Sequence, residues 1–154
     1  MFEDLIQNLQ SFVDTLPMAL QALALLGIGA VPVLEGDVAA LIGMVAGVPM
    51  VLTIIFAAAG TILATMAAVA WGARIGDKRE KGDRERKIMA RVEKWGIPIA
   101  MLIGGFFVSV SINAFVMSAA GLNRSIVLIS GIVTAVFNTV LVALIAAGAL
   151  QVLL

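Results

Sequence analysis

The sequence contains no cysteine and no histidine among its 154 residues. The absence of cysteine excludes disulfides, thiolate nucleophiles and thiol-based metal sites. The absence of histidine removes the commonest metal ligand and the side chain that most often shuttles protons near neutral pH. The chain also lacks a glycine-rich phosphate loop with its lysine. We therefore expect that this protein is not an enzyme and that it holds no metal ion and no cofactor.

Charge is scarce as well. Charged residues make up 13% of the chain, whereas they make up about 25% of a typical soluble domain. Hydrophobic residues make up 62%, and the mean hydropathy is +1.11. This composition predicts an all-α integral membrane protein in contact with the lipid bilayer, and it argues against a soluble bundle of buried helices. The segment 1–16 has acids but no Lys or Arg, unlike the basic start of a signal peptide.

The charges that exist are concentrated in one segment. Nine of the ten basic residues lie between Arg74 and Lys94 together with five acidic residues, which gives this segment a net charge of +4. Long apolar runs flank it, so we interpret it as a cytoplasmic loop under the positive-inside rule and not as a nucleic-acid-binding surface. Trp71 and Trp95 bracket the loop and are predicted to anchor it at the membrane interface. The tenth basic residue, Arg124, is either another anchor or an ion-pair partner for an acid of the first half.

The apolar pattern divides the chain into amphipathic, short apolar and long apolar segments. In the first half these are an amphipathic helix over 1–15, an apolar run over 16–34, a short apolar segment over 38–47 and a long one over 50–73. In the second half they are an amphipathic helix over 83–95, a run over 97–122 and a long run over 125–154. A helix needs about 20 residues to cross a bilayer, so the short segment does not cross.

The two halves follow the same order of segments. Pro17 and Pro98 each follow an amphipathic segment and open an apolar run. We therefore predict two inverted repeats, each with an amphipathic helix, a broken or re-entrant hairpin and a long transmembrane helix. The predicted parts of this single membrane domain (1–154) are repeat one over 1–76, the basic cytoplasmic loop over 74–94 and repeat two over 83–154. The N-terminus then lies outside, while a topology in which every segment spans the bilayer stays open.

Glu35 and Asp37 are the only charged residues in the range 15–73. Pro32 precedes them and Gly36 separates them, so we expect the backbone to be broken here. An ionised acid at the centre of a membrane helix costs roughly 2.5–3.5 kcal/mol. On a functional interpretation, desolvation and mutual repulsion favour the protonated forms, so the pair exchanges protons or attracts a cationic substrate. On the alternative interpretation, the break surfaces near the interface and the acids are simply hydrated.

The second half has polar but uncharged groups at the corresponding place. Gly104 and Gly105 predict a break in its apolar run, and a polar stretch over 109–113 follows them. Asn113 and Asn138 are candidates for lining a polar path, or alternatively for hydrogen bonding between helices, as small polar side chains do in membranes. Together with the two acids, these amides are the candidate proton or substrate site.

The sequence resembles two related families, the small multidrug export proteins and the DedA membrane proteins. The first half is similar in a proline, a Gly–acid pair, a short apolar run and a glycine-rich helix that ends in an aromatic segment. These residues are Pro32, Glu35-Gly36-Asp37, Gly43, Ala46-Gly47, Gly60 and Trp71 to Gly76. The second half is similar at Gly96, Gly104-Gly105-Phe106, Asn113 and Ala119 to Gly121. The resemblance implies paired re-entrant hairpins in inverted repeats and a transport function, although Asn113 stands where DedA proteins carry an arginine that would hold a phosphate.

Two functions fit these features. The first is a small secondary transporter or exporter of the bacterial cytoplasmic membrane, coupled to protons and acting as a homo-oligomer, because one chain of this size barely encloses a pathway. The second is a non-catalytic accessory subunit that packs onto a larger membrane complex, such as a respiratory assembly. Small residues at four-residue spacing, as in Gly72-x-x-x-Gly76, would provide close helix contacts in either case.

Overall fold

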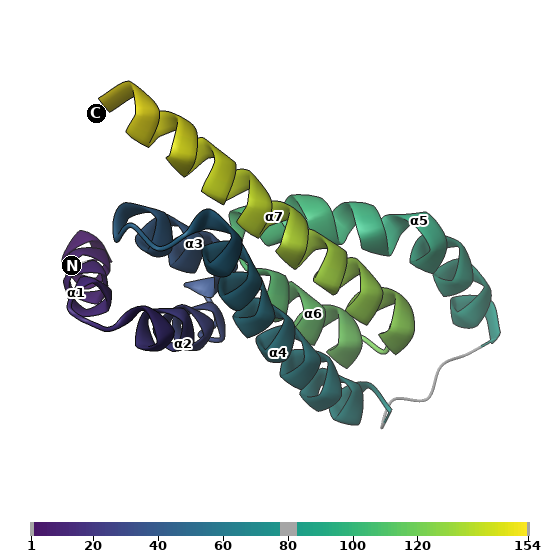
Figure 1. Ribbon diagram of the computed structural model, residues 1–154. Helices are drawn as coiled ribbons and strands as arrows, with labels where there is room; N and C mark the ends of the chain where they lie inside the picture. The colour runs from purple at the N-terminus through teal and green to yellow at the C-terminus, as the bar shows by residue number, and fades with distance from the viewer. Residues whose placement is uncertain (1, 78–82, 154) are drawn as a thin grey trace. The chain divides into compact units, whose positions relative to one another are not determined.

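The computed structural model describes residues 2–77 and 83–153, with side chains for residues 3–77 and 95–152. Most of the predicted basic loop over 74–94 therefore lies outside the described side chains. The described part of the chain contains α-helices and no strand, which confirms the predicted all-α class. The helices, labelled in Figure 1, are α1 (Phe2–Asp14), α2 (Met18–Gly29), α3 (Glu35–Val45), α4 (Met50–Gly76), α5 (Asp83–Phe107), α6 (Val110–Ala119) and α7 (Arg124–Leu153).

These helices divide between two compact units. Unit 1 consists of Met1–Thr61 and Val136–Leu154, and unit 2 consists of Ile62–Ala135. Unit 1 therefore contains α1, α2, α3, the first part of α4 and the last part of α7. Unit 2 contains α5, α6 and the remaining parts of the two long helices. Because α4 and α7 each contribute to both units, the units do not coincide with the repeats that the sequence suggests.

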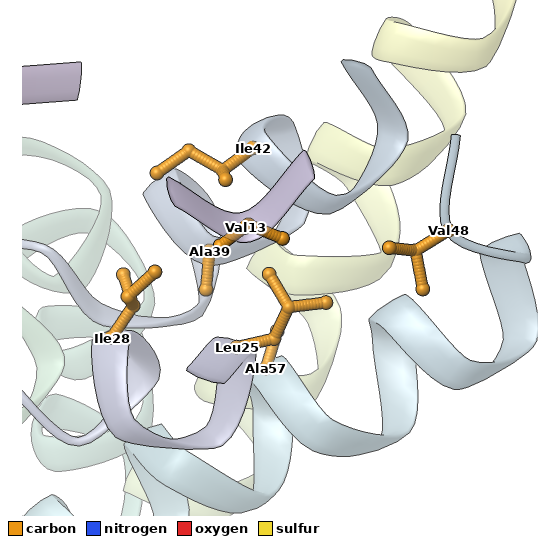
Figure 2. Packing of buried hydrophobic residues seen from close by; sticks show 7 residues of the cluster. All are labelled: Val13, Leu25, Ile28, Ala39, Ile42, Val48 and Ala57. Carbon is orange, nitrogen blue, oxygen red and sulfur yellow. The ribbon is translucent and has the colours of Figure 1, made fainter. Parts of the chain in front are cut away.

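A cluster of buried apolar side chains, drawn in Figure 2, holds unit 1 together. Its members come from α1, α2, α3, α4 and the turn before α4. The cluster comprises Val13, Leu25, Ile28, Ala39, Ile42, Val48 and Ala57. Burying a leucine or isoleucine of this kind stabilises the fold by roughly 1.5–3 kcal/mol. Ile6 and Leu9 of α1 also pack against it, and α1 contacts both α2 and α3. The apolar face of the predicted amphipathic helix is therefore used for packing inside unit 1.

Unit 2 has its own core, in which α5 packs against α6. The buried members are Val69, Ile97, Met101, Val110, Ala114, Val127 and Ala135. The second part of α4 approaches α6 through Gly72 and Gly76. A Cβ atom at these positions would lie 2.5 Å from the carbonyl oxygens of Phe115 and Ser118, respectively. The glycine pair that the sequence singles out thus makes a close helix contact within the chain.

The short helices α3 and α6 end in the same way. Gly47 and Gly121, just past their last turns, both have a φ of +75°, which glycine adopts without steric cost. In each case the N–H of the residue after the glycine donates to a carbonyl in the last turn, at 2.9 Å for α3 and 3.1 Å for α6, as in a Schellman motif. The long helices α4 and α7 begin at the same distance in sequence after these two glycines.

Among the described residues, two helices are long and apolar enough to cross a membrane, judged by length and composition, namely Met50–Gly76 and Arg124–Val152. Their bounds agree closely with the long apolar runs predicted over 50–73 and 125–154. The other apolar helices, Met18–Gly29, Trp95–Phe107 and Val110–Ala119, are shorter. This pattern of two long and several short apolar helices is the one that the sequence predicts.

The structure corrects two details of the second half. The amphipathic segment over 83–95 is not a separate helix, because α5 continues through Pro98 to Phe107; a proline inside a helix removes one hydrogen bond and does not always end it. The break also lies after Gly104 and Gly105 rather than at them. A Cβ at Gly104 would meet the side chain of Asn113 at 2.7 Å, so the small residues here serve close packing.

Candidate functional site

The turn between α2 and α3 is a strained break in unit 1. Pro32 lies between the end of α2 at Gly29 and the start of α3 at Glu35. Val33 has a φ of 82° and Glu35 a φ of 49°, and such conformations cost on the order of 1–3 kcal/mol each for residues other than glycine. Strain of this kind persists only where the surrounding contacts enforce it, and it is typical of functional sites.

Glu35 and Asp37 lie in the first turn of α3, where the partial positive charge of a helix N-terminus stabilises carboxylates. Glu35 is 5% exposed, whereas Asp37 is only partly buried. The burial of Glu35 argues against the interpretation that both acids are simply hydrated at a surface turn. The two carboxylates are therefore unequal, and Glu35 is the one that the fold encloses.

Thr61 of α4 connects the two sides of the break. The N–H of Gly36 donates to Thr61 Oγ1 at 2.6 Å, so a side chain from another helix satisfies a free N–H at the start of α3. The Thr61 hydroxyl lies 3.2 Å from the carbonyl oxygen of Gly29 and 3.4 Å from that of Ala57, and it can donate to either. No pattern in the sequence singles out Thr61, because one threonine in an apolar helix is common.

The last part of α7 brings Thr139 to the break and carries a second buried polar residue, Asn138, next to it in the sequence. A Cβ atom added at Gly36 would collide with Thr139 Oγ1, so this hydroxyl lies directly against the first turn of α3. Thr139 is 0% exposed and its hydroxyl has no hydrogen-bond partner among the described residues. Asn138 is 1% exposed, and neither its Nδ2 nor its Oδ1 has such a partner. Unit 1 therefore combines Glu35, Asp37 and Asn138, three of the predicted site residues, with buried polar groups that are not satisfied.

These residues lie near the middle of both long helices. Thr61 is close to the midpoint of α4, and Asn138 and Thr139 are at the midpoint of α7. If α4 and α7 cross a bilayer, their midpoints are where polar groups cost most and where they most often mark a functional site.

Asn113, the remaining site candidate, belongs to unit 2. Its Nδ2 is buried against Gly104 and has no hydrogen-bond partner in the described part of the chain. Ser109 caps α6 by accepting from the N–H of Ile112 at 3.2 Å, which explains why α6 begins where it does. Unit 2 also holds a buried, unpartnered threonine, Thr65, which a Cβ at Gly131 would meet at 2.8 Å.

The predicted interface residues are all exposed. The side chain of Arg124 forms an ion pair with Asp77, an acid of the predicted basic loop and not of repeat one. Both partners are exposed, so this pair is compatible with Arg124 as an interface anchor. The side chains of Trp71 and Trp95 are also exposed. Trp95 lies at an apolar groove of about 470 Å³ in unit 2, lined also by Pro98, Ile99, Leu102, Ile129, Ser130, Val133 and Thr134.

We predict that Asn138→Leu raises the free energy of unfolding by about 1–3 kcal/mol. An apolar side chain of similar size would remove a buried amide that has no partner, and with it the desolvation cost of that amide. Unfolding of the purified protein in detergent by denaturant measures the change. Gln151→Leu is the control, because it makes the same kind of replacement at an exposed position of α7 and should change stability by no more than about 0.5 kcal/mol. A loss of stability in Asn138→Leu would mean that the amide is satisfied in the folded protein.

Within the described residues, no group of three or more Asp, Glu, His or Cys side chains could hold a metal ion. The oxygen atoms at the break in unit 1 are mainly hydroxyls and carbonyls, and Glu35 is its one buried acid. Comparisons with protein-family models, with curated proteins and with solved structures find no match to this chain.

Proposed function

We propose that this protein is a small secondary transporter of the bacterial cytoplasmic membrane, which exports cationic compounds in exchange for protons and is related to the small multidrug export proteins. The observation that carries this proposal is the burial of Glu35 at a strained helix break, beside the unsatisfied Thr139. A carboxylate in such a place can be neutralised either by a proton or by a cation, and competition between the two is the basis of exchange.

The surfaces of α4 and α7 support insertion in a membrane. Only 33% of the apolar stretch of α4 and 44% of that of α7 are buried, whereas the core helix of a soluble protein is mostly buried. Large apolar side chains are exposed along both helices, including Val51, Ile55, Leu63, Met66, Ile129, Val133, Phe137, Leu144 and Ile145. So many exposed large apolar side chains on two long helices are rare in soluble monomers and suit contact with lipid.

The matched helix ends support the proposed inverted repeat. α3 and α6 are short helices with the same glycine turn, and each is followed at the same interval by a long apolar helix. Helices of 11 and 10 residues are too short to cross a bilayer, so we propose that they are arms of re-entrant hairpins. With the basic loop in the cytoplasm and the N-terminus outside, α4 and α7 would cross in opposite directions, as the long helices of inverted repeats do.

Transport by the purified protein tests the proposal. The protein is reconstituted in liposomes, and ethidium, a fluorescent cation, is the probe. A proton gradient imposed across the membrane should drive ethidium against its own gradient, with a matching movement of protons in the opposite direction. Ethidium distribution equal to that in protein-free liposomes, with no linked proton movement, would contradict the proposal.

Mild-detergent extraction followed by mass spectrometry addresses the alternative, an accessory subunit of a larger complex. A homo-oligomer of this chain is the expected result for a transporter. Recovery of this chain in a fixed ratio with large membrane proteins would instead favour the accessory role. That conclusion would not depend on the burial of Glu35.

A further inference from the structure

We propose that the break between α2 and α3 is a sodium site, in which one partly dehydrated Na⁺ is held by Thr139, Thr61 and the backbone carbonyls around them, with Glu35 supplying the balancing charge. This inference rests on the site of the proposed function, because it names the ion that binds there. It does not require that the protein transports a substrate.

Oxygen atoms converge at Gly36. The three heavy atoms nearest to a Cβ placed on this glycine are Thr139 Oγ1, Thr61 Oγ1 and the carbonyl oxygen of Ala57, the last at 3.3 Å. The carbonyl oxygen of Gly29, at the last residue of α2, joins the same group through Thr61. The three nearest neighbours of a Cβ at Gly36 are thus all oxygens, from α4 and α7, so polar atoms lie together at this point of unit 1.

The orientation of Thr61 leaves it able to bind a cation. Its hydroxyl accepts from the N–H of Gly36 at 2.6 Å and donates its one hydrogen toward Gly29 or Ala57. A hydroxyl oxygen has two lone pairs, so one stays available after the N–H bond is made. The carbonyl of Gly29 is at the C-terminal end of α2, where the partial negative charge of a helix favours a cation.

The hydroxyl of Thr139 provides a second, independent observation in favour of a bound ion. It is fully buried, it lies against Gly36, which separates the two acids in the sequence, and it has no partner among the described residues. A buried polar group without a partner destabilises the folded state, and a ligand at the site would remove that cost. The missing partner has to be small, because the hydroxyl already touches the backbone of α3.

The number of buried acids and the kinds of oxygen ligand at the break favour a monovalent ion. Glu35 is the buried acid of the break, and Asp37 is partly exposed. Ca²⁺ takes six to eight oxygen ligands, commonly with several carboxylates, and Mg²⁺ keeps several of its waters. Broken helices inside membranes bind Na⁺ through unwound carbonyls and helix C-terminal ends, and the carbonyl of Gly29 is such a helix end.

The test uses the thermal stability of the purified full-length protein in detergent. Replacing choline chloride by sodium chloride at equal ionic strength should raise the Tm of the wild-type protein by roughly 2–4 °C, because an ion that binds only the folded state stabilises it. Potassium chloride should raise the Tm less. Thr139→Val, which keeps the shape of the side chain and removes its hydroxyl, should lose the response to sodium.

Thr65→Val is the matched control. Thr65 is also fully buried and also lacks a hydrogen-bond partner in the described part of the chain, but it lies in unit 2. Its replacement should leave the response to sodium intact. Equal Tm values in sodium and choline for the wild-type protein, or an undiminished response in Thr139→Val, would overturn the proposal.

Two further outcomes separate this inference from the proposed function. If Thr139→Val does not fold, binding of radioactive sodium to the wild-type protein decides, with one ion per chain expected and no saturable binding overturning the proposal. A sodium response without ethidium transport would support the ion site and contradict the transporter. Proton-driven ethidium transport without a sodium response would support the transporter and overturn the sodium site.

Discussion

Glu35→Gln combined with Asp37→Asn should abolish ethidium transport driven by a proton gradient. Both changes keep the shape of the side chains and remove their charge, so the site can no longer exchange a proton for a cation. Transport in the double variant is measured in liposomes under the conditions used for the wild-type protein. The expected result is a rate equal to that of protein-free liposomes, with expression and solubility unchanged.

The single variants Glu35→Gln and Asp37→Asn should reduce ethidium transport to different extents. Glu35 is enclosed by the fold and Asp37 is partly exposed, so Glu35→Gln alone should account for most of the loss. Glu3→Gln with Asp14→Asn is the control, because it removes two acids from exposed positions of α1. This control should transport at the wild-type rate. Wild-type transport by the Glu35 and Asp37 double variant would contradict the assigned site.

Gly60→Ala should destabilise the protein more than any other replacement of a glycine by alanine in unit 1. A Cβ at Gly60 would collide with the carbonyl oxygen of Leu26 and would lie 2.7 Å from the nitrogen of Ala30. These are backbone atoms, so no side chain can rotate to make room and α2 has to move away from α4. Overpacking of this kind costs about 1–3 kcal/mol and occasionally more. We expect a loss of stability at or above the upper end of this range.

Gly148→Ala provides the control for this prediction. Gly148 also lies inside a long apolar helix, but nothing is within 4 Å of a Cβ placed there. The substitution should therefore stabilise α7 by up to about 1 kcal/mol, because alanine favours a helix over glycine. Denaturant unfolding in detergent measures both variants. If Gly60→Ala is as stable as Gly148→Ala, the close contact between α2 and α4 does not exist in the protein.

The helical class and the long segments could be predicted from the sequence because they depend on local pattern. The apolar run that begins at Met50 is uninterrupted, and the structure begins α4 at that residue. The break beside Pro32 follows from the geometry of proline itself. In the second half the glycines led to a wrong position for the break, because Gly104 and Gly105 lie inside α5 and contact other side chains.

The composition of the site depended on tertiary structure and could not be predicted. Glu35 and Asp37 look alike in the sequence, and only the packing of unit 1 buries one more than the other. Thr61 and Thr139 were not candidates, because hydroxyls in apolar helices usually bond to their own backbone. They come from two helices that are far apart in the sequence, so no local pattern could show that both approach Gly36.

The discontinuous make-up of unit 1 has a consequence for how the protein is synthesised. Unit 2 is a single stretch, Ile62–Ala135, but unit 1 needs residues from Val136 onward. The ribosome therefore delivers every residue of unit 2 before it delivers Asn138 and Thr139. Until then Gly36, the residue between the two acids, lacks the α7 hydroxyl that lies against it. The part of α7 from Val136 onward therefore completes the surroundings of the break only after the whole of unit 2 has been synthesised.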